Sequence, residues 1–564
     1  MLPIQKRWHV APPITPEAEQ ELTDYPPYLR QILYNRGYTT SDSAQRFLDV
    51  QTPEEASPLI LKTMPEAVDR LRHAIDAHEP IAIYGDYDAD GVTATALLIQ
   101  ALRSLDAKVQ EYIPNRFDEG YGVNKDALTT LHERGVKLVV TVDCGMRSAK
   151  ETEHANHLGV DLIITDHHLP GDETPRAIAI INPKQLGDNY PYKDMAGVGL
   201  AYKLTDALFQ SFDISPNKIE EYLDLVAIGT VADMAPLTGE NRWLVRNGLM
   251  RMRRTNRQGL MSLIGVSGLR PERLTATNLG FAIGPRLNAA GRLDSALASL
   301  RLLLTEDVNE AGKLAQELDN QNRERQKITR EIQTAAESIA RVSDPETLLI
   351  FASHPDFNAG VVGLAASRLC EQYYRPAIVA HQDEEITIGS CRSIPEFHIT
   401  NALDECADLM EKYGGHAAAA GFTIRNENLP ALVTRLEQIA QSQLGSLDLR
   451  PLIKIDAEVT FKDMRYAYEE LEKLQPTGLG NPTPIFVSRG VRVENSQVIG
   501  KQFEHLRLTV KDSSGIVFNA IAFRQGHVVL QKGQFIDLAF TLELNEFNGR
   551  SSLQLNVRDL KICT

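Results

Sequence analysis

Short aliphatic runs that end in acidic or glycine residues alternate with helix-like segments from about residue 78 onward. The clearest runs are IAIYGDYDADG at 81–91, KLVVTVDCG at 137–145 and VDLIITDHH at 160–168. Strands that alternate with helices indicate βαβ units, in which helices cover both faces of a parallel sheet. Because ligands bind at the carboxyl ends of such strands, the acidic residues that follow the runs are predicted to gather on one rim.

The pattern divides the chain into five regions. Residues 1–75 form a Pro-punctuated start with short helices, and 76–305 hold the first α/β domain. Residues 306–341, rich in Glu, Gln, Arg, Asn and Lys, predict a long and mostly solvated connecting helix. A second α/β region occupies 342–450, and alternating short strands at 451–564 indicate a small β barrel or sandwich. The predicted fold class is therefore α/β, with two domains joined by a long helix and followed by a β barrel.

Composition agrees with a folded protein of several domains. The chain has 564 residues, and at about 150 residues per domain it should hold three or four domains. Hydrophobic residues make up 43% and charged residues 24%, as in soluble globular proteins. The formal charge of −16 excludes a wholly basic nucleic-acid coat protein, but it permits a local basic groove and a carboxylate cluster that holds divalent cations.

The cysteines and the N-terminus favour a reduced, cytoplasmic location. The five cysteines are odd in number and widely spaced, without a C-x-x-C pair or a Cys/His zinc pattern. The first twenty residues lack the apolar core of a signal peptide, and no window approaches the ~18 apolar residues of a membrane span. We therefore expect a cytoplasmic protein without a membrane segment.

The strongest local signal is the triplet Asp86, Asp88 and Asp90, spaced two apart directly after a buried run. Taken alone, each aspartate could cap the next helix or fill a turn. Capping does not explain why Asp143 ends the second run and Asp166-His167-His168 end the third. Carboxylates and imidazoles converging without a Lys or Arg in the same loops would repel one another and raise carboxylate pKa values.

Divalent cations would remove this repulsion. Oxygen-rich ligands with one or two imidazoles suit Mn²⁺ or Mg²⁺, and bridging carboxylates can hold two ions about 3.5–4 Å apart for phosphoryl transfer. The motifs therefore predict a metal-dependent hydrolase centre. Asp233, in LDLVAIGTVADMAPL, would by itself be interpreted as a turn residue.

The segments GDYDADG, VDCG, TDHH and GTVADMAPL resemble, in order, the signature segments of the DHH phosphoesterase family. With GPRLNAAGR and GGHAAAAGF, the chain resembles the single-stranded-DNA exonucleases of that family from its helical start to its β tail. The resemblance implies that two metals are held, with Asp143 bridging, by five residues: Asp88, Asp90, Asp143, His167 and Asp233. It implies that Asp86 orients a water or ligand and that His168 contacts the scissile phosphate, although either could be a structural support.

The resemblance also implies substrate-binding residues. Arg286, Asn288 and Arg292, in a predicted small-residue loop, would clamp the substrate, since guanidinium groups bind phosphate in a bidentate manner. A Gly-Pro turn with solvated arginines is the alternative for this segment.

Further candidates lie in the second α/β region and in a polar loop. Ser390 with Arg392 would hold the 5′ terminal phosphate, and Arg116 would meet a downstream phosphate or simply lie on the surface. The motif Gly414-Gly415-His416 would position a phosphate, while its glycines could equally permit tight packing.

The β tail resembles an OB-fold, which binds single strands by stacking bases on aromatic side chains. Phe486, Phe503, Phe523 and Phe547 are available, and the pattern alone does not separate stacking residues from core residues.

The function expected from the resemblance is a 5′→3′ exonuclease specific for single-stranded DNA, acting in recombination and repair with two Mn²⁺ or Mg²⁺ ions. Two alternatives stay open: a phosphoesterase for short oligonucleotides, cyclic dinucleotides or pyrophosphate, and a non-catalytic DNA-binding protein. The implied partners are a single-stranded DNA-binding protein and a RecQ-type helicase. The sequence lacks a G-x-x-x-x-G-K-[ST] motif, so we expect no ATP-driven step, and AGVGLAY at 196–202 is interpreted as a turn into a helix.

Overall fold

The computed structural model describes the chain except for residues 1–4, 52–56, 116–119, 121, 294, 341, 343, 345, 548, 549 and 564. Contacts divide the chain into two compact units. The smaller unit consists chiefly of Glu317–Ile453, and the larger unit chiefly of Trp8–Gly291 and Lys454–Thr564. Among the described helices, none combines the length and apolar character needed to cross a bilayer.

The larger unit contains a five-stranded parallel sheet built from the aliphatic runs. Its strands are β2 (Ile81–Gly85), β3 (Val109–Tyr112), β4 (Leu138–Val142), β5 (Asp161–Thr165) and β6 (Ala179–Ile181). The spatial order is β3-β2-β4-β5-β6, so the chain leaves β2 toward one edge and returns through β4 toward the other. This is a topological switch point, where open α/β sheets bind their ligands.

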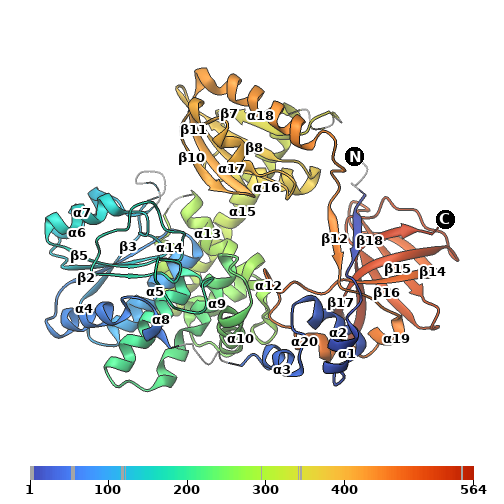
Figure 1. The fold of residues 1–564 in the computed structure, drawn as a ribbon, viewed down its shortest axis with the longest axis horizontal. Coiled ribbons are helices and arrows are strands. Elements are labelled where there is room, and N and C mark those ends of the chain that lie inside the picture. Colours follow the sequence, from blue (N-terminus) through green and yellow to red (C-terminus); the bar gives the residue numbers. More distant parts are fainter. Residues whose placement is uncertain are drawn as a thin grey trace. The chain divides into compact units, whose positions relative to one another are not determined.

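Helices cover both faces of this sheet (Figure 1). Alternate side chains of β2 and β4 pack with α6 (Lys125–Glu133) and α7 (Ala149–Leu158) in one buried cluster. On the other side α5 (Ala89–Arg103) and α8 (Gly197–Ser211) contact the strands, and α4 (Met64–Asp76) contacts β6 and α8. The start of α8 at Gly197 agrees with a turn into a helix for AGVGLAY.

Further helices complete this part of the larger unit. They are η1 (Pro58–Ile60), η2 (Pro216–Tyr222), α9 (Leu223–Ala232), α10 (Gly239–Met252), α11 (Gln258–Val266), η3 (Pro271–Arg273), α12 (Ala276–Asn278), η4 (Leu279–Ile283, a π-helix), α13 (Gly284–Leu293) and α14 (Leu297–Leu304).

The prediction of a small-residue loop at GPRLNAAGR was wrong, because these residues form α13. α13 continues directly from the π-helix η4, which ends at Ile283, so Pro285 lies where the π-helix gives way to the α-helix. Ala289, Ala290 and Gly291 are buried, so their small side chains serve close packing of the helix rather than a flexible loop.

The predicted connecting helix is α15 (Val308–Ile339), of 32 residues. Most of its side chains are exposed or half-buried, as the polar composition suggests. Its first buried apolar positions, Ala311, Leu314, Ala315 and Leu318, recur at the spacing of one helical face, and Ile332 and Ala336 are buried further along.

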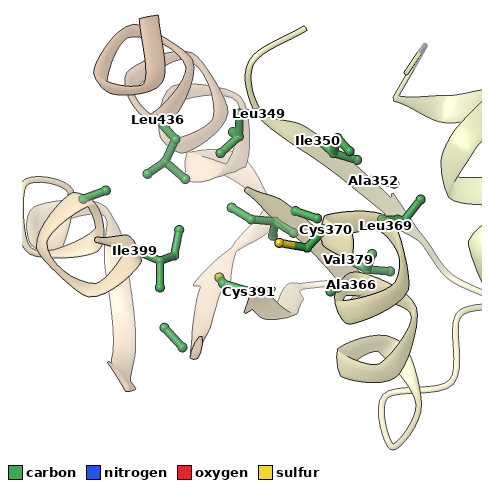
Figure 2. Packing of buried hydrophobic residues seen from close by; sticks show 14 of the residues in the cluster. Leu349, Ile350, Ala352, Ala366, Leu369, Cys370, Val379, Cys391, Ile399 and Leu436 are labelled. Carbon is green, nitrogen blue, oxygen red and sulfur yellow. The ribbon is translucent and has the colours of Figure 1, made fainter. Parts of the chain in front are cut away.

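The smaller unit holds a mixed five-stranded sheet in the order β10-β11-β9-β8-β7, in which only the pairing of β7 with β8 is parallel. The strands are β7 (Ile350–His354), β8 (Ala377–Gln382), β9 (Ile386–Arg392), β10 (Met410–His416) and β11 (Ala419–Arg425). The accompanying helices are α16 (Val362–Tyr373), α17 (Ile399–Asp404), η5 (Ala407–Leu409), η6 (Asn426–Asn428) and α18 (Leu429–Leu444). Figure 2 shows their shared core, to which Ile350, Leu369, Cys391 and Leu436 contribute.

The C-terminal region closes into a five-stranded barrel, because β14 pairs with both β15 and β17. Its strands are β14 (Phe486–Ile499), β15 (His505–Lys511), β16 (Val517–Ala522), β17 (Phe535–Phe547) and β18 (Arg550–Ile562). Four short elements precede the barrel in the chain and follow α18: β12 (Leu452–Ile455), β13 (Ala457–Glu458), α19 (Phe461–Met464) and α20 (Tyr468–Glu472).

The N-terminal helices share the core of this barrel. Leu29 and Leu33 belong to the same buried cluster as Phe486 and Phe540. The helices concerned are α1 (Pro16–Glu21), α2 (Pro27–Asn35) and α3 (Ser41–Asp49), while β1 (Arg7–Val10) pairs with β12. The apolar faces of these helices are therefore buried by a segment more than four hundred residues away.

Candidate metal centre

The acidic motifs meet at the carboxyl ends of β2, β4 and β5, which are adjacent strands of the parallel sheet. Asp86 follows β2, Asp143 follows β4, and Asp166 follows β5. Because β2 and β4 flank the topological switch point, their loops diverge and leave room between them. The predicted gathering of these residues on one rim is what the structure has.

The first loop is fixed by hydrogen bonds to backbone N–H groups. Asp88 is the N-cap of α5, and its Oδ1 accepts hydrogen bonds from the N–H groups of Asp90 (2.9 Å) and Gly91 (3.1 Å). Asp90 is buried, and its carboxylate accepts from the N–H groups of Gly197 (2.7 Å) and Val198 (2.9 Å) at the start of α8. Two helix N-termini therefore orient the carboxylates of this loop.

Asp143 lies at the centre of the cluster with only 2% of its surface exposed. Its φ of 61° is in the left-handed region, which aspartate and asparagine tolerate better than most residues. A Cβ at Gly197 would lie 2.8 Å from Asp143 Cβ, so the start of α8 can approach this closely only without a side chain. Backbone strain and close packing together aim the carboxylate into the site.

The third loop is fixed by Asp166. Its carboxylate accepts hydrogen bonds from the N–H groups of Met146 (2.8 Å) and His168 (3.0 Å), and its Oδ1 lies 2.7 Å from His168 Nδ1. Asn182, which follows β6, donates from Nδ2 to the carbonyl oxygen of His168 (2.9 Å). These contacts fix the His168 ring and the backbone of the loop that also carries His167.

The histidines and the fourth element complete the site. His167 Nε2 lies 3.1 Å from Asp143 Oδ1, and His167 Nδ1 lies 3.8 Å from Asp233 Oδ2. Asp233 caps the C-terminus of α9. Three overlapping groups each place their ligand atoms within 4.8 Å of one another: Asp86, Asp88 and Asp143; Asp143, His167 and His168; Asp90, His167 and Asp233.

Burial and mutual repulsion dominate the electrostatics of the cluster. Burial, followed by the charge of Asp88, raises the pKa of Asp90 to about 7. Burial, followed by the charge of Asp90, raises the pKa of Asp233 to about 9 and that of Asp143 well above its ordinary value. Burial lowers the pKa of His167 to about 4, so this imidazole is neutral and can act as a ligand.

The pKa of His168 shifts in the opposite direction to that of His167. Burial alone would lower the pKa of His168, but the hydrogen bond and the negative charge of Asp166 outweigh burial and raise it. The same contacts lower the pKa of Asp166 against the effect of its own burial. His168 therefore favours the cationic form beside a group of carboxylates, as suits a residue that contacts a phosphate.

The donor set fits divalent cations. In the part of the chain that the structure describes, Asp143 Oδ1 and His167 Nε2 are buried without a hydrogen-bond partner, although only 3.1 Å separates them. Two such atoms are satisfied by a cation between or beside them. Burial raises the pKa of the neighbouring Cys144 thiol well above its ordinary value, so no thiolate is offered, and the carboxylate and imidazole ligands suit Mn²⁺ or Mg²⁺.

The predicted clamp residues of α13 lie in different surroundings. Asn288 Oδ1 accepts a hydrogen bond from the N–H of Ala89 (2.6 Å), in the metal loop. Arg286 Nη1 donates to the carbonyl oxygen of Ala282 (2.8 Å). Arg292 groups with the smaller unit and donates from Nη1 to the carbonyl oxygen of Gly360 (3.2 Å). Arg116 lies outside the described residues.

In the smaller unit, Ser390 and Arg392 are near the first turn of α16. A Cβ at Gly363 would lie 3.3 Å from Arg392 Nη2 and 3.4 Å from Ser390 Oγ. Since Arg292 contacts Gly360, three of the predicted residues converge on the N-terminus of this helix. Exposed N–H groups and the helix dipole make such a position suited to an anion.

The glycine-histidine motif shares a sheet face with these residues. Across β10, β11 and β9, Gly414 is opposite Gly421, which is opposite Ser390. In the next row on the same face, His416 is opposite Ala419, which is opposite Arg392. The small residues of β11 leave this face open between the two outer strands, and Gly414, Gly415 and His416 are exposed.

Two contributors to the metal centre received no role from the sequence pattern. Gly197 permits the approach of α8 to Asp143, and Asp166 orients His168. The signal for Asp166 was its place directly after a strand, and that for Gly197 was a glycine at a predicted helix start. Neither signal says that Gly197 meets Asp143 or that Asp166 accepts from the N–H of Met146, because those partners lie in other segments.

Comparisons with known proteins match every domain of the chain. Family models match at residues 80–230 (DHH family, N-terminal domain), 346–442 (DHHA1 domain) and 455–559 (RecJ OB domain). The single-stranded-DNA-specific exonuclease RecJ of Bacillus subtilis (strain 168) is 39% identical over 100% of this chain and 72% of that protein. The RecJ protein of Escherichia coli (strain K12), named in the same way, is 36% identical over 95% of this chain and 96% of that protein.

Solved structures agree with the sequence relatives. The crystal structure of RecJ from Thermus thermophilus in complex with Mn²⁺ has a TM-score of 0.84 at 31% identity, covering 99% of this chain and 80% of that one. The Mg²⁺ complex of RecJ from that organism has a TM-score of 0.79 at 30% identity, covering 99% and 79%. With its acidic cluster at the sheet switch point and its closed C-terminal barrel, the chain belongs to the RecJ family of DHH phosphoesterases.

Proposed function

We propose that this chain is a metal-dependent exonuclease that removes nucleotides from the 5′ end of single-stranded DNA during recombination and repair. The observation that carries the proposal is the set of overlapping ligand groups in which Asp143 and His167 are each shared. Two divalent ions held by these residues would lower the pKa of a bound water and neutralise charge on the leaving oxygen of a phosphodiester. Full-length relatives named as single-stranded-DNA-specific exonucleases support the choice of substrate.

Each part of the cluster has a defined task in this proposal. The cations are held by five residues: Asp88, Asp90, Asp143, His167 and Asp233. Asp86 offers a further ligand atom within 4.8 Å of those of Asp88 and Asp143. Asp166 keeps a proton on His168 Nδ1, so that the cationic imidazole attracts the scissile phosphate. Bound cations would offset the burial and the mutual repulsion that raise the pKa values of these carboxyls.

The smaller unit supports recognition of a 5′ terminal phosphate. Ser390 Oγ and the Arg392 guanidinium lie against the first turn of α16, and Arg292 approaches the loop before it. Burial lowers the pKa of Arg392, yet a guanidinium keeps its charge at neutral pH. A partly desolvated guanidinium at a helix N-terminus suits a terminal phosphate, which carries more charge than an internal one.

The polarity is tested with single-stranded DNA labelled at the 5′ end in one sample and at the 3′ end in another, with Mn²⁺, Mg²⁺ or EDTA. We expect early release of short labelled products only from the 5′ label, and none in EDTA. Cleavage of dinucleotides without cleavage of long strands would instead support a small-substrate phosphoesterase, and inactivity on both would support a non-catalytic binding protein.

Substitution Arg392→Gln should weaken the preference for a 5′-phosphate over a 5′-hydroxyl by ~10-fold or more, because one charge-assisted contact is lost.

The barrel supports a polymeric substrate over the small-substrate alternative. Among the four aromatic candidates, Phe486 is fully buried, and the side chain of Phe547 is outside the described residues. Phe503 is 72% exposed and Phe523 is 48% exposed. Phe503 lies in the loop between β14 and β15, which in OB-folds takes part in binding single strands.

Contacts link the two exposed rings to one surface. The Phe523 ring meets His505 edge to face at 5.2 Å, and the N–H of Arg524 donates to His505 Nδ1 (3.1 Å). The N–H of Gly526 donates to the carbonyl oxygen of Glu504 (3.1 Å), next to Phe503. Exposed aromatic rings with a neighbouring arginine fit bases and backbone of a single strand.

A double substitution, Phe503→Ala with Phe523→Ala, should weaken binding of long single strands by ~10- to 100-fold, since stacking contributes about 1–3 kcal/mol per base. Dinucleotide hydrolysis should stay unchanged. The matched control is Phe535→Ala, because Phe535 is 52% exposed but lies away from this loop. It pairs with Arg492 of β14, which is opposite Lys511 at the far end of β15. Binding is measured by fluorescence anisotropy on strands of increasing length. Equal loss on long and short substrates would contradict a binding role for this surface.

The partners and the location that the family implies stay predictions. A single-stranded DNA-binding protein would present the substrate, and a RecQ-type helicase would supply the single strand, because the sequence carries no P-loop of its own. We propose that this work takes place in the cytoplasm, in line with five cysteines of which four are buried as free thiols.

A further inference from the structure

We propose that α13 is the support of the first metal loop and that Asn288 is a positioning residue for divalent cations rather than a clamp on DNA. This inference rests on the proposed two-metal function and assigns a different task to the GPRLNAAGR segment. Two independent contacts of one helix face carry it.

The first contact is the hydrogen bond from the N–H of Ala89 to Asn288 Oδ1, at 2.6 Å. Ala89 is the first residue of α5, and N–H groups at a helix start have no partner within the helix. Asp88 Oδ1 accepts from the next two N–H groups, those of Asp90 and Gly91. Asn288 therefore completes the capping of α5.

Because Asn288 and Asp88 each accept from different N–H groups of α5, the orientation of the Asp88 carboxylate is determined. With Ala89 satisfied from α13, Asp88 serves the helix through Oδ1 alone in the hydrogen bonds described above. Its other oxygen is then available for a cation together with Asp86 and Asp143. Without Asn288, the Ala89 N–H would compete for the same carboxylate, and the loop would lose one fixed point.

The second contact is made three residues further along the same helix face. A Cβ at Gly291 would lie 2.6 Å from the carbonyl oxygen of Tyr87 and 3.4 Å from Tyr87 Cβ. The backbone of α13 is thus pressed against Tyr87 while Asn288 holds Ala89, so residues on both sides of Asp88 are fixed by one helix. A hydrogen bond from Ser299 Oγ, on α14, to the carbonyl oxygen of Leu287 (2.9 Å) anchors α13 to α14.

The same geometry gives Asn288 a task inside the chain. Its Oδ1 accepts from the chain's own backbone, so this contact holds the side-chain amide against the start of α5. A residue that holds a metal ligand in place acts on metal affinity first, typically by 10- to 100-fold. A residue that clamps DNA acts on KM for DNA and leaves metal affinity unchanged.

The test measures Mn²⁺ binding to the full-length protein by isothermal titration calorimetry, without DNA. Asn288→Ala should weaken Mn²⁺ binding by ~10- to 100-fold. Asn288→Asp keeps an acceptor for the Ala89 N–H and should retain most of the affinity. The matched control, Asn256→Ala, removes an exposed asparagine just before α11 and should bind Mn²⁺ as the unsubstituted protein does.

Kinetics then separate the two roles. With saturating Mn²⁺, the activity of Asn288→Ala should return toward that of the unsubstituted protein, with KM for DNA unchanged. Unchanged Mn²⁺ affinity together with a raised KM would overturn the proposal and restore the clamp. If Asn288→Ala fails to fold, Asn288→Asp still decides, because a clamp on phosphate would lose DNA binding when it gains a negative charge. Normal Mn²⁺ binding by the unsubstituted protein without DNA cleavage would contradict the exonuclease function and leave this inference standing.

Discussion

Replacing Asp143 with asparagine is expected to abolish hydrolysis and, in the same protein, to raise the stability of the metal-free form. Asp143 is shared by two of the ligand groups, so loss of its charge should lower the rate by roughly 10³-fold or more. Asparagine has the same shape and tolerates the φ of 61°, so the backbone needs no rearrangement. Alanine would add backbone strain to the loss of charge.

The gain in stability follows from the direction of the pKa shifts. Burial and mutual repulsion raise the pKa of Asp90 to about 7, that of Asp233 to about 9, and that of Asp143 well above its ordinary value. A carboxyl whose pKa is raised by folding binds its proton more tightly in the folded state, so its penalty grows as the pH rises. These three carboxyls should therefore contribute a loss of stability to the metal-free protein between about pH 4 and pH 9. Removing one of the charges should recover about 1–2 kcal/mol at pH 8.

The measurement is urea unfolding in EDTA at pH 8, paired with thermal unfolding with and without Mn²⁺. Mn²⁺ should raise the Tm of the unsubstituted protein and leave that of Asp143→Asn unchanged. The matched control is Asp166→Asn. Asp166 is also buried, but its hydrogen bond with His168 lowers its pKa, so this substitution should destabilise the metal-free protein. A less stable Asp143→Asn in EDTA, or one with full activity, would contradict the assignment.

Replacing Arg242 with methionine is expected to cost about 3–5 kcal/mol of unfolding free energy, because several hydrogen bonds to a charged group, each contributing about 1.5–3 kcal/mol, are lost together. Arg242, on α10, is 2% exposed. Its Nη1 donates to the carbonyl oxygens of Leu474 (2.7 Å) and Pro476 (3.1 Å), and its Nη2 donates to that of Lys473 (3.0 Å). Its Nε donates to the carbonyl oxygen of Phe47 (3.3 Å), over whose ring the guanidinium lies at 4.1 Å.

This one guanidinium ties α10 to the segment before the barrel and to α3. Burial lowers its pKa to about 9, and carbonyl oxygens replace the water that it loses. Methionine fills a similar volume but leaves those carbonyl oxygens without their donor. The measurement is the free energy of unfolding in urea, with hydrogen exchange followed in residues 461–481.

The neighbouring Arg246 provides the control. It lies on the same helix and, among the described residues, donates to one carbonyl oxygen, that of Leu48 (3.1 Å). Arg246→Met should cost only about 1 kcal/mol. Similar losses in both variants would show that Arg242 contributes by packing alone and not through its set of hydrogen bonds.

Much of the metal centre could be predicted from local pattern. A buried aliphatic run followed by an acidic residue places that residue at a strand end, and parallel strands present their carboxyl ends on one edge. Asp86, Asp143 and His167 were therefore predictable as neighbours, even though the residues between them number in the tens. The long helix and the closing strands of the barrel likewise follow from periodicities of 3.6 and 2.

Local pattern failed where a residue's role depends on a distant partner. The small residues of GPRLNAAGR suggest a loop, and only packing against Tyr87 and Ala89 shows why a helix needs them. Asn288 and Ala89 are 199 residues apart, and Arg242 and Leu474 are 232 apart. The separation into core and exposed aromatics of the barrel also required the closed strands.

Local pattern was enough to predict most strands and helices, the order of the acidic motifs and their common edge, because these depend on neighbours within one turn or one strand. It did not predict the helix α13, the backbone groups that orient the carboxylates, or the burial of Arg242. Those outcomes depend on which surfaces pack together, and packing brings together residues that no local periodicity relates.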